Sequence, residues 1–183
     1  MTEAGEPFRR PPVRKFAALS VSGLGAGGRF SGYASLFHEM DLARDVIEPG
    51  AFSRSLAVKG ADGVRMLYQH DPAEPIGRWT VIREDARGLY VEGQLSLGAA
   101  RADAVHANLL NRAIDGLSIG FRAVRSRQDA ARRSRHILEA DLWEISIVTF
   151  PMLPSARIAT LKTRIPPPPP RPAPQRLHFP GRG

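Results

Sequence analysis

The chain has no cysteine among its 183 residues, which excludes a thiol nucleophile, a disulfide framework and a thiolate metal site. No apolar run approaches the ~18 residues that a membrane-spanning helix needs. Residues 1–14 are polar, with several prolines, and lack the apolar core of a signal peptide. We therefore expect a soluble intracellular protein, and the missing cysteines fit a reducing compartment.

Acidic residues are absent after Glu144, whereas arginine and lysine continue to the end of the chain, and the net charge is +8. The last part is also rich in proline, with an unbroken run at 166–170, which excludes helix and sheet and favours polyproline II. We predict a basic disordered tail at 1–14, one folded domain at 15–161 and a proline-rich, basic, disordered tail at 162–183. Such tails are either electrostatic handles for nucleic acid or acidic proteins, or solubilising segments.

The folded part is dominated by predicted strands, with no regular alternation of strand and helix. A short helix is predicted at 51–58 and a longer one at 99–114, where Ala102, Val105, Leu109, Leu110 and Ala113 form an apolar stripe. Loops are predicted at 37–49, which is acidic, and at 125–135, which is basic. Strands are predicted at 15–21, 29–37, 64–69, 76–83, 89–97, 117–124 and 137–150. This pattern indicates an α+β fold built on a β-barrel or strongly curved sheet with flanking helices.

Three stretches each place one chemically useful side chain in or beside a strand-like run: His70 in YQHD, Ser118 in GLSIGF and Glu144 in LWEISIVT. A base, a hydroxyl nucleophile and a carboxylate are the groups that acyl transfer by a serine hydrolase requires. The three residues are therefore the candidate catalytic set.

Ser118 has the Gly-x-Ser-x-Gly spacing of a nucleophile elbow, but that elbow needs a strand before the serine and a helix after it. Here the order is reversed, which excludes the α/β-hydrolase fold. We expect Gly116 and Gly120 to give access to the hydroxyl and to let a substrate backbone approach. On spacing alone, a structural serine in a tight turn is the competing interpretation.

The other two candidates also have plain alternatives. His70 follows a strand and precedes Asp71, so it fits a locally hydrogen-bonded loop histidine as well as a general base. Glu144 shares a period-2 face with Leu142, Ser146 and Val148, and burying it requires a partner. An edge position facing water, or a salt bridge to Arg122 or Arg78, would satisfy it as well as an imidazolium. Asp141 and Asp71 are rivals of Glu144, and Ser146 is a rival of Ser118.

Two further patterns are weaker. The glycines at 23–28 match Gly-x-Gly-x-x-Gly, but a strand-like segment follows where a dinucleotide site needs a helix. Asp41, Asp45 and Glu48 near His38 match no closed metal site, and a solvated acidic loop is favoured. No cofactor and no metal are expected.

Short motifs follow one another in order between Gly32 and Ala159 and together resemble the HK97-type phage prohead proteases, a family also found in prophages and gene-transfer-agent clusters. The motifs are GYASLF (32–37), DVIEPGAF (45–52), LYQHD (67–71), PIG (75–77), GLYVEG (88–93), GLSIGF (116–121) and EISIVTFP (144–151). The resemblance implies a serine endopeptidase related in fold to the herpesvirus assemblins. It implies His70 as general base and Ser118 as nucleophile, and Glu144 is carried over as the third member.

The resemblance also implies the substrate, since family members cleave the scaffolding segment of the major capsid protein and usually themselves. The expected partners are thus the capsid protein, its scaffolding segment and the protease itself, with homo-oligomerisation left open, no membrane, and nucleic acid only through the basic tails. The expected location is inside the immature capsid in the cytoplasm of a bacterial host. The alternatives from other classes are a non-enzymatic basic virion or nucleic-acid-associated protein and a hydrolase of a small ester or amide.

Overall fold

The structure is a computed structural model that describes residues 27–162, with side chains placed through residue 159. The strand predicted at 15–21, the predicted N-terminal tail and residues 163–183 of the predicted C-terminal tail lie outside these residues. The tails and the domain limits at 15 and 161 therefore stay predictions.

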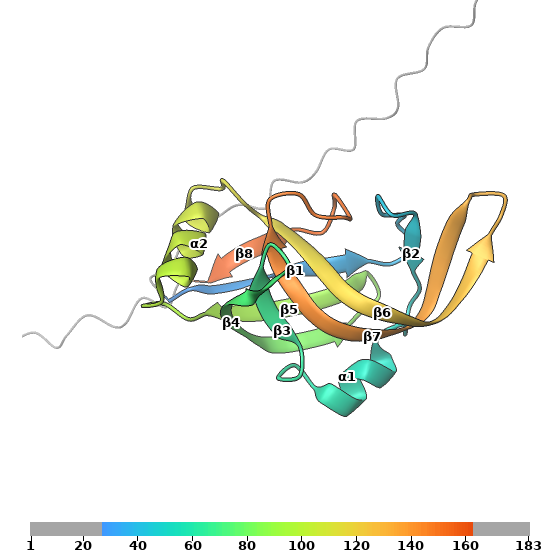
Figure 1. Cartoon of the computed structure of the whole chain (residues 1–183), viewed down its shortest axis with the longest axis horizontal. Helices are drawn as coiled ribbons and strands as arrows, with labels where there is room; N and C mark the ends of the chain where they lie inside the picture. The colour runs from blue at the N-terminus through green and yellow to red at the C-terminus, as the bar shows by residue number, and fades with distance from the viewer. Residues whose placement is uncertain (1–26, 163–183) are drawn as a thin grey trace, which may run out of the picture.

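One mixed eight-stranded sheet forms the body of the protein (Figure 1). The strand order is β2-β7-β3-β4-β5-β1-β8, with β6 paired to β7. The β2–β7 and β3–β7 pairs are parallel and the other pairs are antiparallel. The strands are β1 (Arg29–Leu36), β2 (Asp45–Ile47), β3 (Arg65–Tyr68), β4 (Asp71–Glu84), β5 (Gly88–Leu95), β6 (Gly116–Asp129), β7 (Ser134–Val148) and β8 (Ile158–Lys162).

The sheet curls until β6, near one end of the strand order, meets the segment that leads into β8 at the other end. Leu117 donates its N–H to the Ala156 carbonyl at 3.0 Å, and Ile158 donates to the Asp115 carbonyl at 2.8 Å. These bonds give the sheet a barrel-like closure at the start of β6. The predicted α+β class, with a strongly curved sheet and flanking helices, is confirmed.

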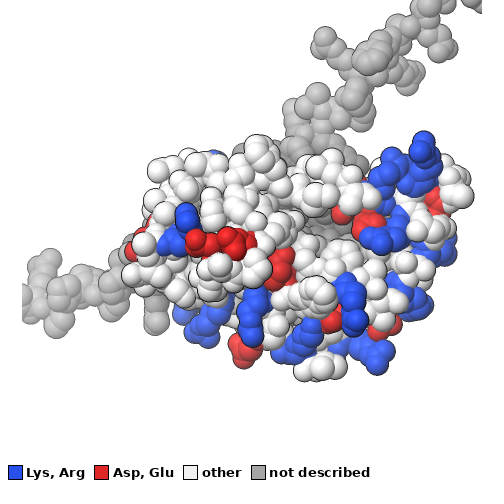
Figure 2. Space-filling view, in the orientation of Figure 1, with Lys and Arg blue, Asp and Glu red and all other residues white. Residues whose placement is uncertain are grey.

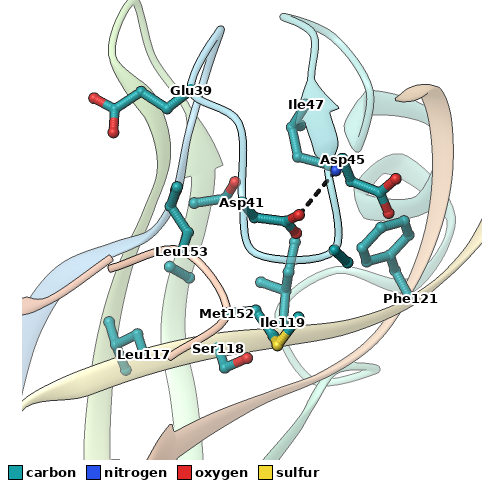
Figure 3. Close-up of a pocket in the computed structure, with 13 residues that line it drawn as sticks. Glu39, Asp41, Asp45, Ile47, Leu117, Ser118, Ile119, Phe121, Met152 and Leu153 are labelled. Atoms are coloured by element: carbon teal, nitrogen blue, oxygen red, sulfur yellow. Dashed lines mark hydrogen bonds between the residues drawn. The ribbon is translucent and has the colours of Figure 1, made fainter. Parts of the chain in front are cut away.

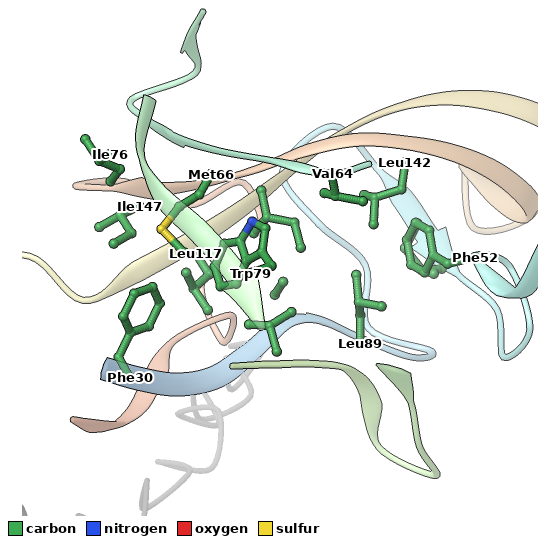
Figure 4. Close-up of a cluster of buried hydrophobic side chains, with 14 of the residues drawn as sticks. Phe30, Phe52, Val64, Met66, Ile76, Trp79, Leu89, Leu117, Leu142 and Ile147 are labelled. Atoms are coloured by element: carbon green, nitrogen blue, oxygen red, sulfur yellow. The ribbon is translucent and has the colours of Figure 1, made fainter. Parts of the chain in front are cut away.

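The core fills the inside of this curve with side chains from most of the strands (Figure 4). Trp79 and Phe30 are almost completely buried and pack edge to face, with ring centroids 5.5 Å apart. Leu117, Ile145 and Ile147 extend the core along β6 and β7. Burial of each large side chain contributes about 1.5–3 kcal/mol. The core thus holds β6 and β7 in place, and their opposite face carries Ser118 and Glu144.

Two helices lie against the sheet, α1 (Ser53–Lys59) and α2 (Ala100–Leu110) (Figure 1). Ala102, Val105 and Leu109 of α2 are buried as the apolar stripe predicts, but Ala113 is exposed. The helix ends before the predicted limit of 114, and the chain turns at Arg112, where φ is 56°. No helix in residues 27–162 is long and apolar enough to cross a membrane.

The predicted basic loop at 125–135 is wrong, because most of it is strand. The β6–β7 ladder continues to the pair Asp129–Ser134, so the two strands form a long hairpin that projects from the body (Figure 1). Charged side chains occupy both faces of this hairpin, and arginine side chains gather around its end (Figure 2). The sequence of this segment does not alternate apolar and polar residues, so the pattern did not indicate a strand. The predicted acidic loop at 37–49 likewise contains β2, and β8 was not predicted.

Candidate active site

His70 lies in the two-residue turn that joins β3 to β4. Gln69 and His70 both have positive φ, 55° and 60°, a conformation that costs non-glycine residues roughly 1–2 kcal/mol each. Four hydrogen bonds hold the turn against β7 and the residue that follows it. Gln69 N–H donates to the Ile147 carbonyl at 3.1 Å and His70 N–H donates to Ser146 Oγ at 3.1 Å. The side-chain amide of Gln69 donates to Thr149 Oγ1 at 2.7 Å and accepts the Thr149 N–H at 3.4 Å. Strain of this kind, kept in place by surrounding contacts, is typical of functional sites.

The His70 ring is paired with Glu144 across the ends of β3 and β7. His70 Nδ1 lies 2.6 Å from Glu144 Oε1, and the side chains are 42% and 14% exposed. A carboxylate only accepts hydrogen bonds, so Nδ1 carries the proton and Nε2 of the neutral ring is left as the acceptor. The hydrogen bond to Glu144 raises the pKa of His70 above its ordinary value, while partial burial acts against it. The predicted contact between these two residues is present.

A β-bulge in β7 explains how a carboxylate in an apolar strand reaches this histidine. Gly120 pairs with Glu144 and Phe121 pairs with Leu142, so Trp143 is the extra residue. Leu142 is completely buried with the core, whereas Trp143 is 53% exposed. The predicted period-2 face that put Leu142 beside Glu144 is therefore wrong, because a bulge re-aims the side chains that follow it. The alternatives for Glu144 also fail: its side chain is only 14% exposed, and among the described residues its ion-pair partner is His70, not Arg122 or Arg78.

Ser146 connects the two halves of the His70–Glu144 pair. Its hydroxyl donates to Glu144 Oε2 at 2.7 Å and accepts the backbone N–H of His70 at 3.1 Å. The residue is completely buried. The sequence made Ser146 a rival nucleophile. In the structure its hydroxyl instead links the His70 turn to the Glu144 carboxylate through these two hydrogen bonds.

Ser118 lies on β6 directly opposite Ser146. Directly paired residues of an antiparallel ladder project to the same face, so Ser118 shares a face with Ser146 and, through the Gly120–Glu144 pair, with the carboxylate. Ser118 is 3% exposed and its hydroxyl has no hydrogen-bond partner. Leaving a buried hydroxyl unpaired costs about 1–3 kcal/mol. The structure thus joins His70 to Glu144 and places Ser118 on the same face, without a hydrogen bond from Ser118 to the histidine ring.

The two glycines of GLSIG are needed for packing of the chain on itself. A Cβ on Gly120 would lie 2.2 Å from Glu144 Oε1, and a Cβ on Gly116 would lie 2.6 Å from the Val148 carbonyl oxygen and 2.8 Å from Pro151 Cδ. The expectation that these glycines leave room for a substrate backbone is wrong, because Glu144 and the segment after β7 already fill the space. Because Gly120 has no Cβ, the Glu144 carboxylate can occupy the space over this part of β6.

The rival acids have other roles. Asp71 Oδ1 accepts the N–H of Ala73 at 2.8 Å in the β4 start, and Asp141 is paired with Lys59. Glu48, in the acidic segment, accepts from His136 at 2.6 Å and lies 3.2 Å from His38. No group of histidine, aspartate and glutamate side chains within residues 27–162 is arranged to hold a metal ion.

A cavity of about 150 Å³ adjoins Ser118 (Figure 3). Its walls come from β1, from the segment around β2, from β6 and from residues 152–153 that follow β7. The acidic residues Glu39, Asp41 and Asp45 are among those that line it. No sequence pattern pointed to this cavity, because its walls come from four separate parts of the chain.

Comparisons with known proteins agree with this architecture. The family model for caudovirus prohead serine proteases matches residues 17–167. The chain is 36% identical over 147 residues to the prohead protease of Enterobacteria phage HK97, covering 79% of this chain and 65% of that protein. It is 29% identical over 157 residues to the capsid polyprotein of Pseudomonas phage PAJU2, covering 82% of this chain and 22% of that protein. The chain thus spans less than two thirds of the length of either relative.

Among solved structures, the capsid assembly protease of bacteriophage T4 superposes with a TM-score of 0.55 at 14% identity, covering 68% of this chain and 84% of that one. That likeness concerns the fold. Together with the match of the family model over most of the sequence, it leads to one conclusion: the chain belongs to the caudovirus prohead serine protease family.

Proposed function

We propose that this protein is a serine endopeptidase that matures a prohead, with Ser118 as nucleophile, His70 as general base and Glu144 as the residue that orients the base. The observation that carries the proposal is the 2.6 Å contact of His70 Nδ1 with Glu144, on the same sheet face as a buried serine hydroxyl without a partner. Membership of a serine protease family supports the same assignment.

The geometry suggests how each residue acts. Glu144 accepts from Nδ1, which keeps the proton there and leaves the Nε2 lone pair to take the proton of the Ser118 hydroxyl. As Ser118 Oγ bonds to the scissile carbonyl carbon, the ring becomes an imidazolium, which the adjacent carboxylate stabilises. His70 then returns the proton to the leaving amine, and water resolves the acyl-enzyme by the same route. In this scheme Ser146 positions the pair and takes no proton from substrate.

The substrate we propose is the scaffolding segment of the major capsid protein, and the protease itself is a second substrate. The capsid polyprotein of phage PAJU2 contains a segment similar to this chain, so in that phage a homologous sequence and capsid belong to one polypeptide. Because the scaffold lies inside the immature capsid, the proposed site of action of this protease is there, in the cytoplasm of the infected bacterium. High local concentration inside a shell raises the rate of encounter without new contacts.

The experiment is co-expression with the major capsid protein of the same genome, followed by intact-mass analysis of both chains. Wild type is expected to shorten the capsid protein and itself, whereas Ser118→Ala shortens neither. Ser96→Ala, at an exposed serine, is the matched control and should behave as wild type. Intact capsid protein in assembled shells made with wild type would contradict the proposal.

The basic tails have a separate test. Deleting 165–183 and finding unchanged incorporation into proheads would show that this segment does not target the protease to the capsid. If instead the protein binds nucleic acid with an affinity that falls steeply with salt, and Ser118→Ala changes nothing in assembly, the non-enzymatic alternative replaces the protease.

A further inference from the structure

The cavity beside Ser118 has the features of a site for one side chain of a substrate. Its volume of about 150 Å³ exceeds the ~30 Å³ that a water molecule occupies in the liquid, so it has room for several water molecules or for a long side chain. The Ser118 hydroxyl, which is buried and has no hydrogen-bond partner, is part of its lining. In Figure 3 Ser118 lies on β6, below the segment that carries Asp41. A group bound in this cavity is therefore next to the proposed nucleophile.

The charged residues of the lining are all acidic: Glu39, Asp41 and Asp45. Asp45 is neutralised by Arg135, whose guanidinium contacts both carboxylate oxygens at 2.8 and 2.6 Å. Glu39 accepts the hydroxyl of Ser155. Asp41 accepts the backbone N–H of Asp45 at 2.8 Å, and within the described part of the chain it forms no salt bridge. Arg135, which is bound to Asp45, also acts on Asp41 electrostatically, but no cation forms a salt bridge with Asp41 among the described residues.

Apolar side chains complete the walls. Ile47, Phe121, Met152 and Leu153 line the cavity together with the acids. Lysine and arginine place their aliphatic stems along such surfaces and their charged ends on acceptors. Burial is the main cause that raises the pKa of Asp41 above its ordinary value, and the Asp45 carboxylate adds to it, while backbone hydrogen bonds and the charge of Arg135 act against it. A cation bound inside the cavity would stabilise the ionised form of Asp41 further.

We propose that the cavity binds the side chain of a lysine or arginine that adjoins the scissile bond of the substrate, with Asp41 as its anionic partner. The inference rests on the proposed function, because it takes Ser118 as the nucleophile. A basic side chain held by Asp41 would bring the neighbouring peptide bond to the Ser118 hydroxyl. Recognition of the residue and attack on the bond would then use one cavity.

The test begins by mapping the bond that wild type cleaves in the co-expressed capsid protein, from the intact mass of the product. A lysine or arginine is expected on one side of that bond. Peptides that span the mapped site are then compared by kcat/KM, with the basic residue kept or replaced by norleucine, which retains the stem and removes the charge. Wild type should prefer the basic peptide by about tenfold or more, the order expected for a hydrogen bond to a charged group.

Asp41→Asn should reduce that preference to within about threefold, whereas Asp62→Asn, which changes an exposed acid outside the cavity, should leave it as in wild type. A thermal unfolding curve for each variant separates loss of folding from loss of preference. Cleavage by wild type at a bond with no basic neighbour, or a preference that Asp41→Asn leaves intact, would overturn this inference and leave the proposed function standing. Absence of any cleavage by wild type would remove both.

Discussion

Replacing Gly120 with alanine should disable the proposed base without touching it. The new Cβ would lie 2.2 Å from Glu144 Oε1 and 2.9 Å from its Cγ and Cδ. Oε1 would have to move by about 0.8 Å to reach 3.0 Å, a separation below which real Cβ atoms are essentially never found. The same oxygen holds His70 Nδ1 at 2.6 Å, so the whole carboxylate is displaced from its partner.

The size of the effect follows from that displacement. A misplacement near 1 Å in a catalytic arrangement costs about 10²-fold in rate, and a hydrogen bond to a charged group contributes about 1.5–3 kcal/mol. We therefore expect Gly120→Ala to lower kcat by about 10²-fold. We also expect the pKa of His70 to fall toward its ordinary value, because the bond to Glu144 is the main cause that raises it.

The assay is cleavage of the mapped capsid peptide as a function of pH, with the His70 ring titration followed by NMR. Gly27→Ala is the matched control, since a Cβ there meets nothing within 4 Å. The sharper comparison is Gly120→Ala in a Glu144→Ala background, where the atoms that clash are gone and the second change should cost less than about threefold. A folded Gly120→Ala variant with the rate of wild type, or equal losses in both backgrounds, would refute the reasoning.

Three further predictions concern neighbouring residues. Glu144→Gln should lower kcat by about 10²–10⁴-fold and move the acid limb of the pH–rate profile to lower pH, because the base must be neutral and the carboxylate raises the pKa of His70; an unchanged or upward-shifted limb contradicts this. Ser146→Ala should reduce kcat by about tenfold through loss of its two hydrogen bonds, measured by peptide cleavage, and complete loss would instead indicate a nucleophile. Ile145→Ala, at a completely buried position, should lower the free energy of unfolding in urea by about 2–5 kcal/mol. Val124→Ala, at a half-exposed position, should change it by less than about 0.5 kcal/mol, and equal effects would mean that the assigned core is wrong.

The sequence was most informative where one face of a strand is buried and the other is not. In β5, Leu89, Val91 and Leu95 are buried and Tyr90 and Glu92 are not, as the period-2 pattern predicts. The same reasoning failed on the outer part of the β6–β7 hairpin, where buried and exposed residues do not alternate. It failed again at Trp143, because the bulge depends on which residues of β6 lie opposite.

In the candidate site, too, some features could be predicted from the sequence and others could not. The residue types and motif order made His70, Ser118 and Glu144 the candidates, and the structure joins the first and last of these directly. The hydrogen bonds of Ser146 could not be predicted from the sequence, since they depend on a turn in which Gln69 and His70 both have positive φ. Neither residue is of the glycine or asparagine type that normally indicates such a turn. The acidic cavity depends on packing between distant segments, about which local patterns carry no information.

The central claim is that Ser118 is a nucleophile activated by His70, and its most direct test is covalent labelling of the full chain with a fluorophosphonate, followed by peptide mapping. The account predicts one adduct, on Ser118, that His70→Ala nearly abolishes and Ser146→Ala leaves in place. An adduct on Ser146 instead of Ser118, or capsid cleavage that survives Ser118→Ala, would contradict it.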